Sequence, residues 1–293
     1  MKNSSFKVAA GIVLYNPNVP RLIENINAII PQVDELILIE NGSKDISYLG
    51  SIIERFRDYD VPFKVNNSSK GIAYALNQVC LYCWDNHINW AITLDQDSVV
   101  SNDIIAVYKR YVQNDIGILS PKIIDRNFHV NTDNEHVDLQ EINWCITSAA
   151  FTNVKAWHDV GGFDTQMFID WVDTDICYAM RAKGYKVMKT DSTHILHELG
   201  TNAYVAKFLG HEVLVLNRPA FRYYYVARNR IYMARKWKTV SLKHQLKEIF
   251  YSCMISSCWE HHKWANLKAF VRGILDGLRM KPEYNSLEHS CGR

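Results

Sequence analysis

The stretch "AITLDQDSVV" (residues 91–100) joins an apolar run to two aspartates that lie one residue apart. The run Ala91-Ile92-Thr93-Leu94 is typical of a buried strand. A strand that ends on Asp95 and Asp97 brings two carboxylates to the edge of a sheet. This is costly unless a metal ion, an arginine or the N–H groups of a helix end lie opposite. The stretch therefore predicts a sheet edge that binds a positively charged partner.

Strand-like and helix-like segments alternate on both sides of this stretch. The alternation through the first 120 residues predicts an α/β fold with a mostly parallel sheet and helices on both faces. Ligands bind such sheets beyond the carboxyl ends of the strands. We therefore expect the polar clusters "ENGSKD" (40–45), "NNSSKG" (66–71) and "DQDS" (95–98) to converge on one crevice. The expected strands are 7–15, 34–40, 61–65, 90–94, 116–119 and 143–151, and the expected helices are 21–30, 48–56, 71–84, 103–112 and 153–160.

Charge is distributed unevenly along the chain. Residues 201–293 hold 16 of the 33 basic and 6 of the 31 acidic residues, a net charge of +10, and residues 1–200 hold the other 17 and 25, a net charge of −8. The basic part, expected to be helical over about 203–280, is rich in aromatics. Such charge can meet nucleic acid, an anionic lipid or a phosphorylated substrate, and we predict contact with a substrate or a membrane surface and not with nucleic acid. The alternative is a soluble helical appendage that closes a substrate site or forms a dimer.

No export or membrane-spanning signal is evident in the sequence. No run reaches the roughly 18 apolar residues that span a bilayer, and the start "MKNSSFKVAAGIVLYNP" reads as a first strand. The seven cysteines form no regular framework, and the CxxC of Cys80 and Cys83 lies in a helical pattern, so we expect free, packed thiols. We predict a cytoplasmic protein that can associate peripherally with the inner face of the plasma membrane.

Several enzyme classes lack their signatures here. The chain contains no G-x-G-x-x-G after its first strand, no G-x-x-x-x-G-K-[ST], no H-E-x-x-H and no G-x-S-x-G. These absences disfavour dinucleotide oxidoreductases, P-loop NTPases, zinc proteases and serine hydrolases. What remains is carboxylate chemistry beside an open α/β sheet.

Motifs in a fixed order carry a family resemblance. "LDQDS" (94–98), "GGFDTQMFIDWVDTDICYAMRAKGY" (161–185) and "HELG" (197–200) resemble the inverting family 2 glycosyltransferases of the GT-A fold. "LDQDS", "FIDWVD" and "YYYVARN" look most like the bacterial rhamnosyltransferase branch. The resemblance runs from residue 8 to about 235 and continues weakly into "GILDGLRMK". It implies a GT-A domain over residues 1–200, with a Rossmann-like mixed sheet that binds a nucleotide sugar and is flanked by helices. A basic, aromatic helical region on the acceptor or membrane side follows over residues 201–293. The stretch Thr147-Ser148-Ala149-Ala150 departs from the pattern, because a glycine is common where the two alanines stand.

The resemblance also implies roles for the carboxylates. Departure of a nucleoside diphosphate develops negative charge that Mg²⁺ or Mn²⁺ can stabilise. Asp97, the second Asp of the family's DxD, is the expected metal ligand, and Asp95 is expected near the ribose or a metal-bound water. His197 resembles the histidine that completes the metal shell or contacts the diphosphate, with His194 as its local competitor.

A general base must take the proton of the acceptor hydroxyl. The family pattern favours Asp173, because Val172 stands where its first acid often is. Asp175 ranks second and is expected to act as a favourable charge at a helix N-terminus, and Asp170 also competes.

Donor-binding residues follow from the remaining matches. "VLYNP" and "ENGSKD" are expected to flank the base and ribose, and "KGIAYALN" (70–77) to reach the diphosphate or frame the loop. Arg228 in "YYYVARN" is expected to approach a phosphate or the acceptor. The predicted donor-site residues are Tyr15, Glu40, Asn41, Lys70, Asn77, Asp95 and Arg228.

The sequence as a whole predicts a metal-dependent inverting glycosyltransferase. The resemblance implies transfer of L-rhamnose from dTDP-L-rhamnose to a lipid-linked O-antigen or capsule intermediate. Within the same class, the alternative is another hexosyl or galactofuranosyl donor. From a different class, the alternative is a non-catalytic protein that binds a nucleotide sugar or glycan. A sugar nucleotidyltransferase is disfavoured, because "LYNPNVPR" is no glycine-rich loop.

Overall fold

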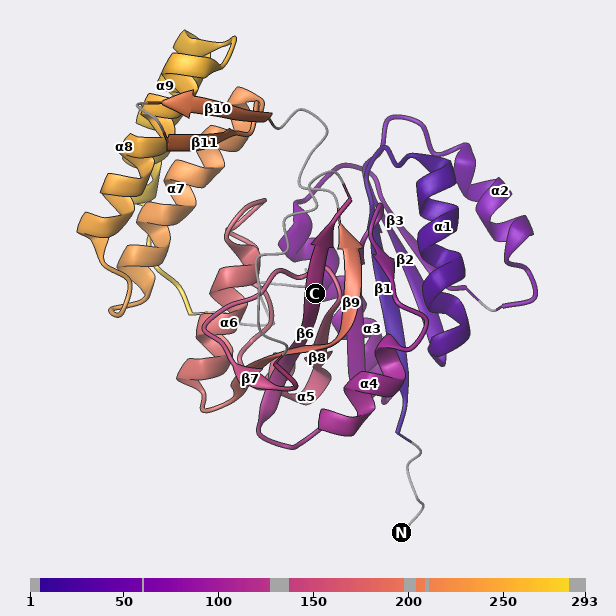
Figure 1. The fold of residues 1–293 in the computed structure, drawn as a ribbon. Helices are drawn as coiled ribbons and strands as arrows, with labels where there is room; N and C mark the ends of the chain where they lie inside the picture. The colour runs from indigo at the N-terminus through magenta and orange to yellow at the C-terminus, as the bar shows by residue number, and fades with distance from the viewer. Residues whose placement is uncertain (1–5, 60, 127–136, 198–203, 209–210, 285–293) are drawn as a thin grey trace. The chain divides into compact units, whose positions relative to one another are not determined.

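The computed structural model describes residues 6–59, 61–126, 137–197, 204–208 and 211–284. Its contacts divide the chain into two compact units, which are described separately. The first contains a large sheet with its covering helices. The second contains Gln166–Asp175 together with the described part of Leu199–Tyr284. Figure 1 shows the elements of both units in chain order.

Nine strands of the described chain form the sheet of the first unit. Four parallel strands come first, in the order β3-β2-β1-β4. β8 then runs antiparallel to both β4 and β6, and β9 is parallel to β6, so β6 and β9 point the same way as β4. The mixed α/β sheet of the expected fold is thereby confirmed. The strands are β1 (Val8–Leu14), β2 (Glu35–Asn41), β3 (Phe63–Asn66), β4 (Trp90–Asp95), β5 (Val99–Val100), β6 (Ile116–Asp125), β7 (Gln140–Glu141), β8 (Ala150–Asn153) and β9 (Lys186–His197).

Helices cover both faces of this sheet because side chains alternate along each buried strand. Ile12 and Leu14 of β1 share an apolar cluster with residues of α1. Gly11 points the other way, and a Cβ there would lie 2.2 Å from Cγ1 of Val79 on α3. The helices α1 and α3 therefore lie on opposite faces (Figure 1). The helical elements are α1 (Val19–Ile29), η1 (Ile30–Gln32), α2 (Tyr48–Arg55), α3 (Ile72–Asp85), α4 (Ile104–Tyr111), α5 (Val154–Asp159) and α6 (Val172–Ala182).

The expected strand at 143–151 is largely wrong, because β8 begins only at Ala150. Residues 142–149 form a loop that ends on Ala149, whose φ is +58°. Its N–H donates to the carbonyl oxygen of Thr93 on β4, and its own carbonyl accepts from the Tyr108 hydroxyl. Alanine is uncommon in this left-handed conformation, which glycine adopts without cost. The loop geometry thus explains why a glycine is common at this point of the family pattern.

The second unit packs three helices around a small apolar cluster. They are α7 (Ala220–Lys236), α8 (Leu242–Trp259) and α9 (Lys263–Arg279). The cluster joins Tyr223, Ala227, Ile231, Ile249 and Phe270. The tail does not begin with a helix as expected. It begins with an antiparallel hairpin of β10 (Tyr204–Phe208) and β11 (His211–Val215), whose valines and aromatic residues suit strands.

Two glycines bring α7 and α9 unusually close together. A Cβ on Gly273 would lie 2.4 Å from the carbonyl oxygen of Tyr224, and one on Gly277 would lie 2.6 Å from that of Arg228. The four-residue spacing places both glycines on one face of α9. The backbone of α9 therefore rests directly on α7, and any larger residue at these positions would push the helices apart.

Two smaller expectations concern the thiols and the membrane. Cys80 and Cys83 are both buried on α3, as predicted for packed helix cysteines. Burial raises the pKa of the Cys83 thiol to about 12, so its reactive thiolate form is disfavoured. Among the described helices, none has the length and apolar character needed to cross a bilayer.

Candidate active site

The carboxyl ends of β1, β2 and β4 meet at one edge of the sheet. In the parallel registers, Val13 lies opposite Asp95, Leu14 opposite Glu40, and Asn41 opposite Asn66. β9 has the same direction as β4, so its last residue, His197, reaches this edge as well. The predicted convergence of polar clusters on one side of the sheet follows directly from these registers.

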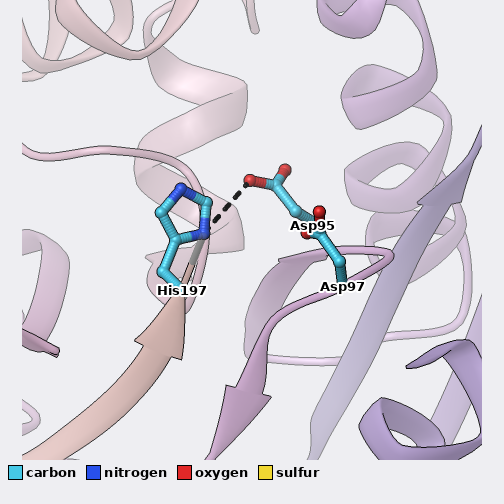
Figure 2. Close-up of side chains that lie close together, drawn as sticks. All are labelled: Asp95, Asp97 and His197. Atoms are coloured by element: carbon cyan, nitrogen blue, oxygen red, sulfur yellow. Dashed lines mark ion pairs between the residues drawn. The ribbon is translucent and has the colours of Figure 1, made fainter. Parts of the chain in front are cut away.

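Asp95, Asp97 and His197 form a compact cluster at this edge (Figure 2). One ligand atom from each residue lies within 4.8 Å of the others. Nδ1 of His197 is 3.9 Å from Oδ2 of Asp95, and both side chains are partly exposed. Two carboxylates and an imidazole are donors that Mg²⁺ or Mn²⁺ accepts. The residues therefore fit a divalent cation, and His197, not its competitor His194, joins the aspartates.

Serine hydroxyls hold the histidine in position. The Ser98 hydroxyl lies 3.0 Å from Nδ1 of His197 and 2.8 Å from the Ser148 hydroxyl. Ser148 comes from the loop before β8 and also accepts from the backbone N–H of Asp95 at 3.4 Å. Groups that orient a ligand side chain help fix its position at a metal. Sequence reasoning missed both serines, although Ser98 lies within the "DQDS" motif and Ser148 within the noted departure from the family pattern.

The loop after β1 is tied to the DxD segment. The Gln96 side chain accepts from the N–H of Tyr15 at 2.8 Å and donates to the Tyr15 carbonyl at 3.2 Å. The Tyr15 side chain is exposed at the edge of the sheet. Gln96, the middle residue of the motif, thus positions the backbone of a predicted donor-binding residue instead of facing a ligand.

Glu40 is buried and organises the turn after β2. Its carboxylate accepts from the Ser43 N–H, from the Ser43 hydroxyl at 2.6 Å and from the Tyr48 hydroxyl at 2.8 Å. Burial, together with the Glu40 hydrogen bond, raises the pKa of Tyr48 well above its usual value. Asn41 donates to the Gly71 carbonyl at 3.2 Å and accepts from the Lys70 N–H at 3.3 Å. These contacts shape the loops on which the predicted nucleotide contacts depend.

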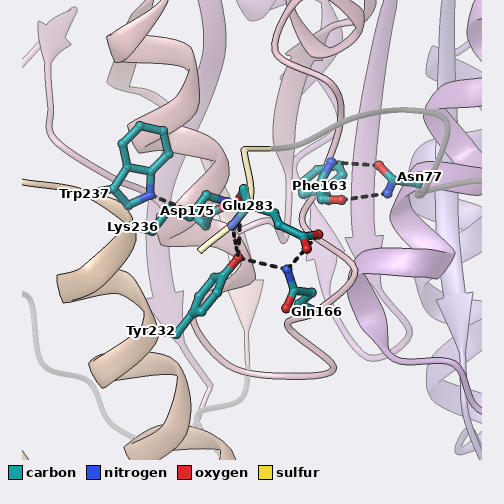
Figure 3. A network of polar contacts seen from close by, with 8 residues as sticks. All are labelled: Asn77, Phe163, Gln166, Asp175, Tyr232, Lys236, Trp237 and Glu283. Atoms are coloured by element: carbon teal, nitrogen blue, oxygen red, sulfur yellow. Dashed lines mark hydrogen bonds and ion pairs between the residues drawn. The ribbon is translucent and has the colours of Figure 1, made fainter. Parts of the chain in front are cut away.

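Asn77 was predicted either to reach the diphosphate or to frame the loop. It is fully buried, and its Oδ1 accepts from the Phe163 N–H at 2.8 Å and from the Trp157 indole at 3.0 Å, while its Nδ2 donates to the Phe163 carbonyl at 2.8 Å (Figure 3). These bonds occupy the amide and pin the "GGFD" turn to α3. The structure therefore supports the alternative in which this residue frames a loop.

The acidic segment Gln166–Asp175 is held by side chains of α7 in the second unit. Asp170 has a φ of +63° and makes a two-point ion pair with Arg222, at 2.6 and 2.8 Å. Asn229 donates to the carbonyls of Ile169 and Asp170. Arg228 donates to the Gln166 carbonyl at 2.6 Å and so contacts the segment, and its role at a phosphate or the acceptor stays a prediction. The "YYYVARN" motif thus supplies groups that fix the backbone just before Asp173.

Asp175 does more than provide charge at a helix end. It lies in the first turn of α6 and is fully buried. It accepts from Nζ of Lys236 at 2.9 Å and from the Trp237 indole at 2.7 Å (Figure 3). Lys236 is buried as well. Asp173, two residues earlier, is only partly buried, and its Oδ1 accepts from the Thr174 N–H at 2.8 Å. The two neighbouring carboxylates therefore have different surroundings, with Asp175 committed to an ion pair.

Removing the buried cation should be strongly destabilising. We expect Lys236→Met to reduce the free energy of unfolding by about 3–5 kcal/mol, because Asp175 is left as an uncompensated buried charge. The measurement is the midpoint of urea unfolding, with Lys243→Met on exposed α8 as the matched control. The double variant Asp175→Asn/Lys236→Met should recover part of the loss. A Lys236→Met midpoint equal to that of the control would contradict the pairing.

Comparisons with known proteins agree with this geometry. The model of the family described as "Glycosyl transferase family 2" matches residues 10–182. A relative from Shigella flexneri, described as dTDP-rhamnosyl transferase RfbF, is 25% identical over 296 residues, covering 93% of this chain and 95% of that protein.

Solved structures share the fold. A mannosyltransferase from Pyrobaculum calidifontis, in complex with GDP-Man and Mn²⁺, has a TM-score of 0.57 and 15% identity, covering 94% of this chain and 76% of its own. S. aureus TarS in complex with UDP-GlcNAc has a TM-score of 0.56 and 12% identity, covering 94% and 81%. These likenesses confirm the GT-A fold.

Two findings define the class of protein. The family 2 model matches more than half of the chain, and the GT-A sheet carries a DxD cluster at its carboxyl edge. The chain belongs to glycosyl transferase family 2. It is accordingly a glycosyltransferase, and the predicted enzyme class is confirmed at that level.

Proposed function

We propose that this chain is a metal-dependent, inverting glycosyltransferase that transfers L-rhamnose from dTDP-L-rhamnose. The observation that most directly supports this proposal is the cluster of Asp95, Asp97 and His197 at the carboxyl edge of β4 and β9. The donor proposal is supported by the similarity to a dTDP-rhamnosyl transferase. The proposed acceptor is a lipid-linked O-antigen or capsule intermediate.

The proposed chemistry assigns separate tasks to the two carboxylate groups. Asp97 and His197 would hold the cation, with Asp95 beside it or near the ribose, and the cation would neutralise charge on the departing diphosphate. Asp173 would take the proton of the acceptor hydroxyl as that oxygen attacks the anomeric carbon. The new C–O bond forms as the bond from the anomeric carbon to the phosphate oxygen breaks. Attack from the opposite side inverts the configuration of that carbon.

The remaining donor residues are proposed to act around the nucleotide. The exposed ring of Tyr15 would face the base, and Lys70 would approach the diphosphate, where a flexible ammonium can meet phosphate oxygens. Glu40 and Asn41 would position these loops, as their hydrogen bonds indicate. The chain's segment at 1–200 would form the catalytic domain, with residues 201–293 on the acceptor side.

The donor can be identified by thermal protection. We expect dTDP-L-rhamnose with Mn²⁺ or Mg²⁺ to raise the melting temperature more than dTDP-glucose, UDP-GlcNAc or GDP-mannose, and EDTA to remove the shift. A ligand at a hundred times its Kd stabilises the folded state by about 2.7 kcal/mol. Larger protection by another nucleotide sugar would overturn the rhamnose proposal and keep the class. Protection by dTDP-L-rhamnose without transfer to any lipid-linked acceptor would favour the binding-protein alternative.

A further inference from the structure

The helix α9 has two apolar faces, and the residues that the structure describes cover only one of them. Asn266, Phe270, Gly273 and Gly277 are buried on the side that packs against α7 and α8. A second row of large apolar side chains is exposed, with Trp264 77% accessible. This row, called the α9 stripe, consists of Trp264, Leu267, Val271, Leu275 and Leu278.

The spacing of the α9 stripe makes it one continuous surface. Its members are three or four residues apart, so on an α-helix they fall within an arc of about 80°. An exposed helix face is ordinarily polar, and single exposed apolar residues need no explanation. Five exposed apolar residues aligned over four turns do need an explanation, because contiguous apolar surface of this kind marks an interaction site.

Basic side chains border the α9 stripe. Lys268, Arg272 and Arg279 fall on the helix face next to it, within roughly 80° of its edge. Arg272 and Arg279 are largely exposed, and their contacts with Asp276, at 3.6 and 3.7 Å, are surface ion pairs that contribute little to stability. Their charge is therefore available to an anionic partner.

The neighbouring helix α8 repeats this arrangement. Leu242, Leu246 and Phe250 are exposed at four-residue intervals, and Phe250 is 72% accessible. Lys243 and Lys247 each follow the row by one position and are exposed. Together α8 and α9 carry six basic and two acidic side chains, a net charge of +4. The same combination on two helices argues against a chance cluster.

We propose that the α9 stripe and its basic border bind the surface of an anionic phospholipid bilayer. Apolar rows beside lysine and arginine are the composition of helices that lie in a membrane interface, and the indole of Trp264 suits the headgroup level. A second copy of this chain fits less well, because its surface would bring the same +4 charge against an identical one. The inference goes beyond the proposed reaction and does not depend on the donor.

Vesicle sedimentation tests this inference. We expect the protein to bind vesicles of phosphatidylcholine mixed with phosphatidylglycerol, to bind vesicles of phosphatidylcholine alone far less, and to be released by salt. Arg272→Gln/Arg279→Gln should weaken partitioning about thirtyfold, since each basic residue contributes about fivefold at such a surface. Val271→Gln/Leu275→Gln should weaken it by about tenfold or more.

Controls separate this inference from the others. Ile53→Gln/Phe63→Gln removes two exposed apolar side chains from the first unit and should leave vesicle binding unchanged. All variants should keep metal-dependent protection by dTDP, so loss of membrane binding is distinguishable from loss of the donor site. Equal binding to neutral and anionic vesicles would overturn the proposal. So would a dimer in lipid-free solution that Val271→Gln/Leu275→Gln converts to monomer.

Discussion

Asp173→Asn is expected to reduce sugar transfer at least about a hundredfold while leaving donor and metal binding nearly unchanged. The substitution keeps the size of the side chain and removes its basicity, and a positioned base typically supplies about 10²–10⁴-fold in rate. The partial exposure of Asp173 beside the fully buried Asp175 supports this choice of base. The measurement is single-turnover transfer at matched donor occupancy.

The neighbouring aspartates provide the controls. Asp175→Asn should chiefly lower stability, because Lys236 then loses its buried counter-charge. Asp170→Asn weakens the ion pair with Arg222 and should affect transfer only through the position of the segment. If Asp173→Asn transfers at the wild-type rate while Asp170→Asn is inactive, the base has been assigned to the wrong residue. If all three retain full transfer, no base acts from this segment.

Asp97→Ala is expected to abolish the metal-dependent part of nucleotide binding. A divalent cation held by one carboxylate fewer binds less tightly, so the affinity for dTDP in the presence of Mn²⁺ should fall by about tenfold or more, to the value measured in EDTA. Titration calorimetry with and without EDTA makes the comparison. Asp58→Ala, which removes an exposed carboxylate elsewhere in the first unit, should leave both values unchanged. Equal Mn²⁺ dependence in wild type and Asp97→Ala would show that the cluster holds no cation.

The sheet edge was predictable from sequence because short stretches of neighbouring residues determine where each strand ends. Apolar runs that end on polar clusters define strands and their carboxyl ends, and parallel order then brings Glu40, Asn41 and Asp95 together. The partner strand β9 was not predicted as a strand, yet His197 was correctly associated with Asp97 through the family motif. Strand β8 was placed too early because the loop before it is as apolar as a strand. The loop ends at Ala149, whose backbone is in the left-handed conformation.

Long-range pairings were beyond sequence reasoning. Nothing in "FIDWVDTD" (168–175) indicates that Asp170 pairs with Arg222, or that Asp175 pairs with Lys236. Arg228, the basic residue of "YYYVARN", was expected at a phosphate or the acceptor because an arginine in a sequence has many possible partners. The sequence left Asn77 with two alternatives for the same reason, since a polar residue in a helix shows its buried partners only after the fold brings them together. Donor residues are thus harder to predict than the sheet edge that carries them.

The way the acidic segment is held has a consequence for protein synthesis. Asp170 and Arg222 are 52 residues apart in sequence, Asp175 and Lys236 are 61 apart, and Gln166 and Glu283 are 117 apart. At translation rates of about 5–20 residues per second, roughly 3–12 s separate Asp175 from its counter-charge on the ribosome. The strands β1 to β4 pair only with one another on their parallel side of the sheet, so they can emerge and pair in that interval. A nascent chain of 197 to 221 residues, or one ended there by a premature stop codon, contains Asp95, Asp97 and His197 but none of the α7 side chains that fix the segment around Asp173.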